Sequence, residues 1–168
     1  CASSPAVYVK SAEKVFVTLA EGSQNTLRNT DEYVAIDDNN IDAVIFAKSD
    51  LTLNGTGSLT IISAEGHGIV SKDDLKIIGG TYDITAGHAL SGKDSVRIAD
   101  GTFILTAEKD GIHAENADDE EKGYIYIADG DFTITSDGDG MDASNIVQIE
   151  DGTLDITAGG GAANSLKT

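Results

Sequence analysis

A short glycine-centred signal recurs along this chain and limits the folds that it can form. Gly-Thr occurs at Gly80, Gly101 and Gly152, and Gly130 followed by aspartate is a variant, so the intervals are 21, 29 and 22 residues. Repetition at such a period is typical of one supersecondary unit stacked on copies of itself. The sequence therefore predicts one solenoid domain over residues 1–168.

Each repeat contains three short segments in which apolar and polar residues alternate, the period of a β-strand. Three strands within a repeat of about 21 residues leave no room for ordinary hairpins. Each strand can instead pair with its equivalent in the next repeat, ~4.8 Å along a common axis. We therefore predict an all-β, right-handed, single-stranded parallel β-helix with three strands per coil. The side chains expected inside include Leu51, Leu53, Leu59, Ile61, Tyr82, Ile84, Phe103, Phe132 and Ile134.

Two segments interrupt the repeat. Residues 28–42 break the alternation and are predicted to form an excursion from the core. Residues 117–123, ADDEEKG, account for the long interval and form an inserted acidic loop, either a tolerated surface insertion or a loop that supplies ligands.

The two ends of the chain look incomplete as coils. The sequence starts just before a first-strand position and stops after a third strand, with no evident cap. Uncapped coils are open sheet edges, so we expect either further N-terminal coils and caps or end-to-end self-association. Cys1 is the only cysteine, which excludes an internal disulfide; it is either a lipidated N-terminus or an ordinary residue.

The charge of the chain narrows its partners. Eleven basic residues stand against 29 acidic ones, and the net charge is −18. Binding of nucleic acid is not expected, because phosphates need a basic surface, and anionic membranes would repel the chain. Divalent cations are natural partners of so many carboxylates.

Stacking converts equivalent sequence positions into columns of neighbouring side chains. One column contains His67, His88, Asp110 and Asp139, and carboxylates are concentrated at its C-terminal end. Calcium takes oxygen ligands from carboxylates, carbonyls and water. The hypothesis is a calcium site; the alternative is ordinary Asp-Gly turn chemistry. The three histidines have neighbours too different in type to predict a zinc site. The predicted calcium ligands are Asp110, Asp137, Asp139 and Asp142.

Two outward-facing columns could contact sugar. The first is formed by the second strand of each coil and contains Phe16, Thr52, Lys76, Arg97, Tyr126 and Gln148. Rings cover the apolar faces of sugars, and an arginine can hold a uronate carboxylate with two hydrogen bonds. We predict that Lys76, Arg97 and Tyr126 bind carbohydrate, whereas cross-strand packing is the alternative. The second column contains Tyr8, Phe46, Val70, Ser91, His113 and Asp142.

Several segments together resemble secreted bacterial carbohydrate-binding β-helix proteins. The matching segments are SPAVYVKSAEKV, LAEGSQNTL, AKSDLTLNGTGSLTI, GIVSKDDLKIIGGT, LSGKDSVRIADGT, KGYIYIADG and DGTLDITAGGG. The resemblance implies a right-handed parallel β-helix, bound Ca2+, and binding to cellulose and acidic pectic sugars outside the cell or at its surface. It also implies a likeness to pectate lyases without established catalysis. His67 and His88 depart from the family pattern, which more often has an acidic residue or Asn there, and Ala89 replaces a glycine.

Three functions remain after these observations. The first is a non-catalytic module that binds polygalacturonate, pectin or cellulose with the help of calcium. The second is a structural or adhesive extracellular filament subunit. The third is a calcium-dependent pectate-lyase-like enzyme, which would need a basic residue such as Lys93 or Arg97 to remove a proton. Neither residue has an apolar setting that would lower its pKa, so we expect no enzyme activity.

Overall fold

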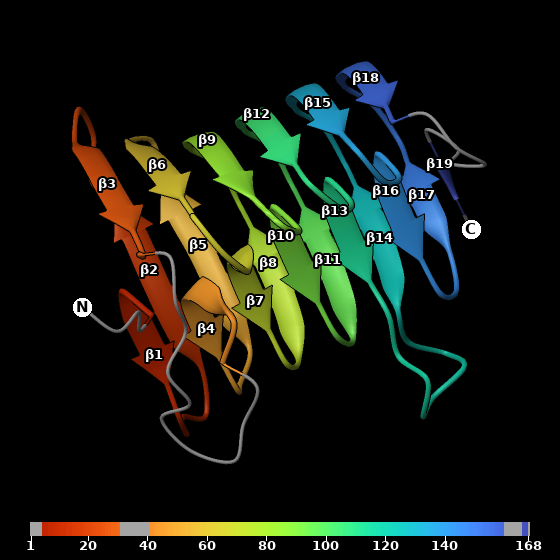
Figure 1. The fold of residues 1–168 in the computed structure, drawn as a ribbon, viewed down its shortest axis with the longest axis horizontal. Helices are drawn as coiled ribbons and strands as arrows, with labels where there is room; N and C mark the ends of the chain where they lie inside the picture. The colour runs from red at the N-terminus through yellow and green to blue at the C-terminus, as the bar shows by residue number, and fades with distance from the viewer. Residues whose placement is uncertain (1–4, 31–40, 160–165, 168) are drawn as a thin grey trace.

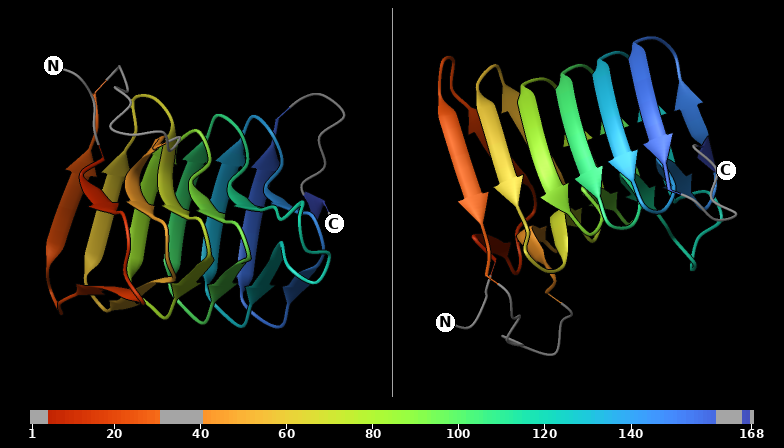
Figure 2. Two further views of the ribbon diagram at one scale, coloured as in Figure 1. Left: turned by 90° about the horizontal axis from the view of Figure 1, so that it is seen from below. Right: turned by 45° about the horizontal axis from the view of Figure 1, so that its top comes forward.

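The computed structural model describes residues 5–30, 41–159, 166 and 167, and all regular structure in these ranges is β-strand. The strands form three parallel sheets in which each strand pairs with its equivalents in the adjacent coils. Figures 1 and 2 show the resulting stack of coils. The predicted parallel β-helix with three strands per coil is confirmed. No helix in the described ranges has the length and hydropathy to cross a membrane.

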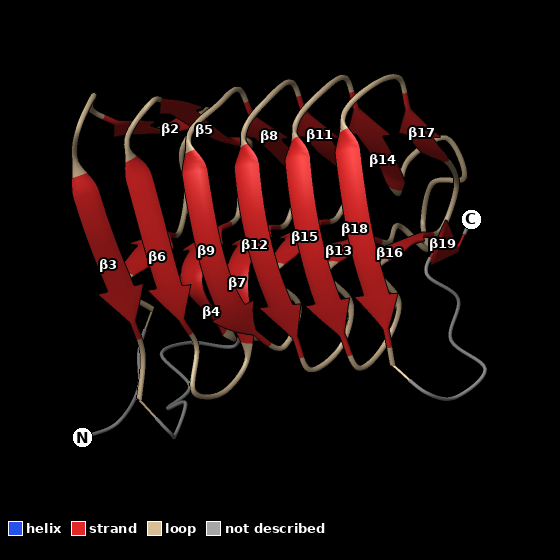
Figure 3. Ribbon diagram, turned by 90° about the horizontal axis from the view of Figure 1, so that it is seen from above, coloured by secondary structure: helices blue, strands red, loops and turns tan. Residues whose placement is uncertain are grey.

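The three sheets take one strand each from successive coils. The first sheet contains β1 (Val7–Val9), β4 (Ala43–Ala47), β7 (His67–Ser71), β10 (Leu90–Gly92), β13 (Ile112–Ala114), β16 (Met141–Ala143) and β19 (Leu166–Lys167). The second contains β2 (Val15–Leu19), β5 (Leu51–Gly55), β8 (Asp74–Ile77), β11 (Ser95–Ile98), β14 (Tyr124–Ile127) and β17 (Val147–Ile149). The third, at the front of Figure 3, contains β3 (Gln24–Arg28), β6 (Ser58–Ile62), β9 (Thr81–Ala86), β12 (Thr102–Ala107), β15 (Asp131–Ser136) and β18 (Thr153–Ala158).

The interior of the helix is a continuous apolar column, as the alternation predicts. In β9, β12 and β15 every second residue is buried and the residues between are exposed. The aromatic rings of the third sheet stack inside: Tyr82 lies 5.1 Å from Phe103, and Phe103 lies 4.6 Å from Phe132. The Tyr82 hydroxyl donates a hydrogen bond to the carbonyl of Gly79, and burial raises the pKa of that hydroxyl. The ladder of rings therefore connects three coils through the core.

The recurring glycine marks the corner before the third strand of each coil. Gly101 and Gly130 have φ values of 143° and 134°, which residues other than glycine rarely adopt. A Cβ on Gly130 would also lie 2.9 Å from the carbonyl oxygen of Gly101 in the coil below. The sequence signal thus reflects both a backbone conformation and the close stacking of corners.

The two interruptions differ in how far the structure describes them. Residues 31–40 of the predicted excursion lie outside the described residues; Arg28 is the last residue of β3, and Ile41 is buried. The inserted segment 117–123 contains no strand. It forms a loop that connects β13 to β14 and projects from the stack in Figure 1.

One of the two outward-facing columns is not an open surface at its N-terminal end. Phe46 and Val70 are 1% and 2% exposed, and they form a second hydrophobic cluster with Ile41 and Ala43, against which Tyr8 packs. The expectation of exposed aromatic residues there was wrong. Ile41, which precedes β4, packs in this cluster, a contact that alternation within strands does not reveal.

Candidate functional site

The Lys76–Arg97–Tyr126 column lies on the outer face of the second sheet, where the sequence placed it. Arg97 in β11 pairs in register with Lys76 in β8 and with Tyr126 in β14. The neighbouring residues Val96 and Ile98 are fully buried, so Arg97 projects from the opposite face and is exposed. The three side chains therefore succeed one another at the spacing of coils, ~4.8 Å.

Shallow hollows flank this column on both sides of Arg97. One, of about 170 Å³, is lined by Lys76, Arg97 and Tyr126. A second, of about 310 Å³, extends from Lys76 and Arg97 past Thr52 to Phe16, whose side chain is 63% exposed. The face thus offers two cations between two aromatic rings, with room for a ligand along the axis of the stack.

Tyr126 is held from the next coil. A hydrogen bond with the carboxylate of Glu150, directly after β17, raises the pKa of the Tyr126 hydroxyl. The carboxylate that interacts with this hydroxyl thus belongs to the coil on the far side of Tyr126 from Arg97.

Three of the four predicted calcium ligands come together. Carboxylate oxygens of Asp110, Asp139 and Asp142 all lie within 4.8 Å of one another; we call these residues the carboxylate triad. Asp110 Oδ1 accepts a hydrogen bond from the Asp139 backbone N–H at 2.8 Å, which fixes the two adjacent coils against each other. Asp137 is exposed and does not belong to this group. The triad is an all-oxygen donor set, so its chemistry fits a calcium ion.

The three histidines stack against one another, which the sequence analysis did not predict. The ring centroids of His67 and His88 are 4.6 Å apart, and those of His88 and His113 are 4.4 Å apart. His67 Nδ1 accepts a hydrogen bond from the backbone N–H of His88. His113 belongs to a different column from the other two, and only the shape of the corner brings it beside His88.

Asp110 lies between this stack and the carboxylate triad. Its Oδ2 is 3.2 Å from His88 Nδ1 and 3.3 Å from His113 Nδ1. Burial disfavours the charged carboxylate, but the adjacent imidazoles of His113 and His88 and the hydrogen bond from the Asp139 backbone outweigh it and hold the Asp110 pKa well below its usual range. Burial likewise opposes a charge on His113, yet Asp110 and Asp142 raise its pKa. His67 differs: burial, together with the charge of His88, lowers its pKa to about 3.

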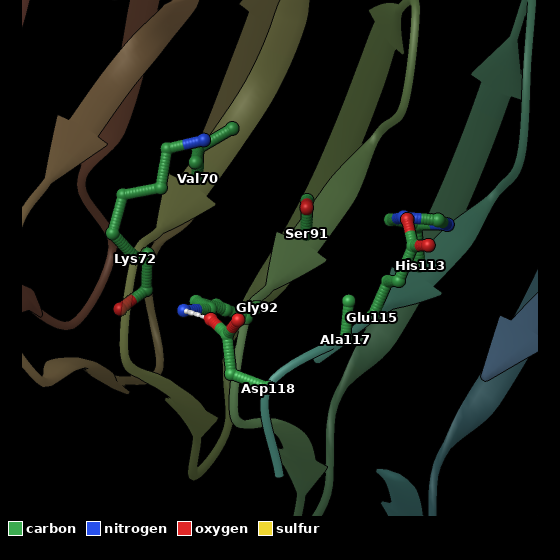
Figure 4. A pocket seen from close by; sticks show the side chains of 10 residues that line it. Val70, Lys72, Ser91, Gly92, His113, Glu115, Ala117 and Asp118 are labelled. Atoms are coloured by element: carbon green, nitrogen blue, oxygen red, sulfur yellow. Dashed lines mark hydrogen bonds and ion pairs between the residues drawn. The ribbon is translucent and has the colours of Figure 1, made fainter. Parts of the chain in front are cut away.

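A groove of about 370 Å³ runs beside this cluster on the outer face of the first sheet. In Figure 4, Lys72 lies on one side of it, His113 on the other, and Ser91 projects between them. Asp118 of the inserted loop closes one wall, and its carboxylate accepts a hydrogen bond from Lys93 Nζ at 2.8 Å. His113 thus belongs both to the groove and to the cluster around Asp110.

The inserted loop is fastened to the stack at its two ends. Lys122 Nζ donates to Asp94 Oδ2 at 2.6 Å, and the Asn116 side chain donates to Asp94 Oδ1 at 2.7 Å. Asn116 Oδ1 in turn accepts the backbone N–H groups of Asp118 and Asp119. The loop therefore has a defined position as the wall of the groove.

Known proteins resemble this chain along its length. A family model described as carbohydrate-binding domain-containing protein matches residues 1–168. The chain belongs to this family. A protein of Acetivibrio thermocellus with the same description is 40% identical over 85 residues, 49% of this chain. A solved structure described as the polysaccharide lyase-like protein from C. thermocellum, as a gadolinium derivative, has 36% sequence identity and a TM-score of 0.91 over 96% of this chain. The matches cover only 30% of the first relative and 66% of the second.

Proposed function

We propose that this carbohydrate-binding domain is a non-catalytic module for acidic plant polysaccharide, polygalacturonate above all, and for cellulose. The observation that carries the proposal is the in-register placement of Lys76, Arg97 and Tyr126 along one exposed face. A polyuronate presents carboxylates and apolar ring faces along its length. An arginine binds a carboxylate with two parallel hydrogen bonds, and an aromatic ring covers a sugar face. The module acts outside the cell or at its surface, where such polymers occur.

Calcium assists binding in this proposal. A chain with a net charge of −18 repels a polyuronate, and a divalent cation offsets that repulsion. The carboxylate triad supplies oxygen ligands of the kind that hard cations prefer. The related structure is described as a gadolinium derivative, and gadolinium(III) also prefers oxygen ligands. This supports testing the carboxylate triad with hard cations.

The proposal assigns no cleavage to the module, because Lys93, a candidate base that lines the groove, is a poor base. A lyase needs a group that accepts a proton near neutral pH. The hydrogen bond and charge of Asp118 raise the pKa of Lys93, which keeps this amine protonated.

Affinity electrophoresis in gels that contain polygalacturonate, with calcium or with a chelator, tests the proposal. Arg97→Ala is expected to weaken binding about tenfold, since a charge-assisted contact contributes ~1.5–3 kcal/mol when desolvated and less on an open face. Tyr126→Ala weakens binding to polygalacturonate and to cellulose by removing the ring. Lys10→Ala, which removes an exposed cation beside β1, is the matched control and leaves binding unchanged.

Two results would contradict this proposal. Binding that survives both Arg97→Ala and Tyr126→Ala moves the site elsewhere, and Lys72→Ala then tests the groove of the first sheet. Absorbance of unsaturated uronates that rises when protein and calcium meet polygalacturonate would establish cleavage instead of simple binding.

A further inference from the structure

We propose that His88, Asp110 and His113 form a binding site for a divalent transition-metal ion of the zinc class. The side chains come from two adjacent coils: His88 precedes β10, whereas Asp110 precedes β13 and His113 lies within β13. Ligand atoms of the three residues all lie within 4.8 Å of one another. We call this set the His–Asp–His site; it shares only Asp110 with the carboxylate triad.

The spacing of its atoms suits zinc. Zinc binds histidine nitrogen and carboxylate oxygen at ~2.0–2.1 Å in a tetrahedron, so neighbouring ligand atoms are separated by roughly 3.3 Å. Asp110 Oδ2 lies 3.2 Å from His88 Nδ1 and 3.3 Å from His113 Nδ1. Two edges of the required tetrahedron are therefore present before any ion binds.

One ligand atom of the site faces two carboxylates but lacks a well-formed hydrogen bond. His113 Nδ1 is buried from solvent and lies 3.3 Å from Asp110 Oδ2 and 3.6 Å from Asp142 Oδ2, in neither case with hydrogen-bond geometry. Burial of a polar nitrogen without a well-formed hydrogen bond is costly, and coordination of a cation would satisfy it. His88 Nδ1 accepts the backbone N–H of Asp110 at 3.3 Å, a long hydrogen bond that metal coordination would replace.

The charges around the site favour a cation, and its donor atoms determine which one. Asp142 Oδ2 and Glu115 Oε2 each lie 3.6 Å from a nitrogen of His113, so negative charge surrounds the ring. Two imidazole nitrogens suit zinc, cobalt or nickel, whereas calcium prefers oxygen. The fourth position belongs either to Asp142, after a small shift, or to water.

Isothermal titration of the tag-free full chain with zinc chloride, after treatment with a chelator, tests the site. Wild-type protein is expected to bind one zinc ion, and cobalt is expected to give the intense visible absorption of tetrahedral coordination. Loss of an outer-sphere partner alone typically costs 10–100-fold in metal affinity. His113→Gln and His88→Gln, each of which removes a ligand, are therefore expected to weaken zinc binding at least tenfold.

His67→Gln is the matched control. It removes the third imidazole of the stack, which supplies no ligand atom to the His–Asp–His site but contacts His88, and it should therefore weaken zinc binding less than either ligand variant does. Thermal unfolding followed by circular dichroism shows that each variant is folded. Absence of zinc binding to wild-type protein, or equal losses in all three variants, would overturn the proposal.

Asp139→Asn separates this site from the proposed calcium site. The variant is expected to weaken terbium binding, measured by luminescence as a probe of hard cations, while zinc still binds. If instead Asp139→Asn abolishes zinc binding and His113→Gln does not, zinc uses the carboxylate triad and the His–Asp–His site is wrong. Loss of terbium binding with zinc binding retained is the expected result, because zinc then binds without Asp139.

Discussion

Asp110 connects the two candidate cation sites through its two oxygens. Oδ1 accepts the backbone N–H of Asp139, which orients the carboxylate triad. Oδ2 faces His88 and His113. A hard cation and a transition-metal ion would therefore compete for one carboxylate, and the identity of the bound ion depends on whether oxygen or nitrogen donors complete its shell.

A second residue-scale feature is the carboxylate Asp73, whose pKa differs between the folded and unfolded chain. Partial burial, a hydrogen bond with Asp94 and the charge of Asp50 raise the Asp73 pKa to about 6. The folded chain thus holds this proton more tightly than the unfolded chain does. The contribution of Asp73 to the free energy of unfolding consequently falls as pH rises from about 4 to about 6. The charged Asp73 then continues to destabilise the fold at higher pH.

We predict that Asp73→Asn stabilises the protein at about pH 8, where the charge is fully present, and has no effect below about pH 4. Solvent screening limits the gain to an increase in Tm of about 1–3 °C. Thermal melts across this pH range measure it. Asp83→Asn removes an equal charge from an exposed position of β9 and is the control. A gain that does not vary with pH, or one that Asp83→Asn reproduces, would contradict the assignment.

At the scale of elements, the aromatic ladder of the third sheet connects β9, β12 and β15 through Phe103. We predict that Phe103→Ala lowers the free energy of unfolding by about 3–5 kcal/mol, because it opens a cavity between two stacked rings. Ile104→Ala, the next position on the same strand, is 49% exposed and should cost much less. Chemical denaturation measures both. Similar losses in the two variants would show that β12 does not bury Phe103 in solution.

The parallel register explains how much of this could be predicted from the sequence. Once repeats are aligned on their glycines, equivalent residues must be neighbours, so the Lys76–Arg97–Tyr126 column follows directly. Alignment says nothing about contacts between columns. His88 aligns with Asp110, and His113 aligns with Ser91, so their stacking depends on the corner before β13 and could not be predicted.

The same limit explains the other differences. Asp137 and Asp139 are separated only by Gly138 in the DGDG segment. Composition alone could not show that the Asp139 side chain is buried and that of Asp137 is exposed. Ile41 covers Phe46 from a segment that has no counterpart in the other coils. Non-repeated segments have no register, so alignment cannot place them.

At the scale of the whole molecule, the net charge and the proposed calcium site both predict that calcium raises the stability of the folded chain. Any salt screens 18 excess negative charges, but a specific site adds stabilisation through binding to the folded state alone. At a hundredfold excess over Kd this contributes about 2.7 kcal/mol, or an increase in Tm of roughly 5–10 °C. Calcium should therefore raise Tm beyond sodium chloride of equal ionic strength, and a chelator should reverse the increase.

Two aspartate variants decide whether that increase arises at the carboxylate triad. Asp139→Asn removes a charge from within the triad and is expected to abolish most of the calcium-dependent shift. Asp137→Asn removes the same charge two residues away, from the exposed position outside the group, and should retain the shift. If both variants respond to calcium equally, the ion stabilises the protein through diffuse screening, and the triad is turn chemistry that only resembles a metal site.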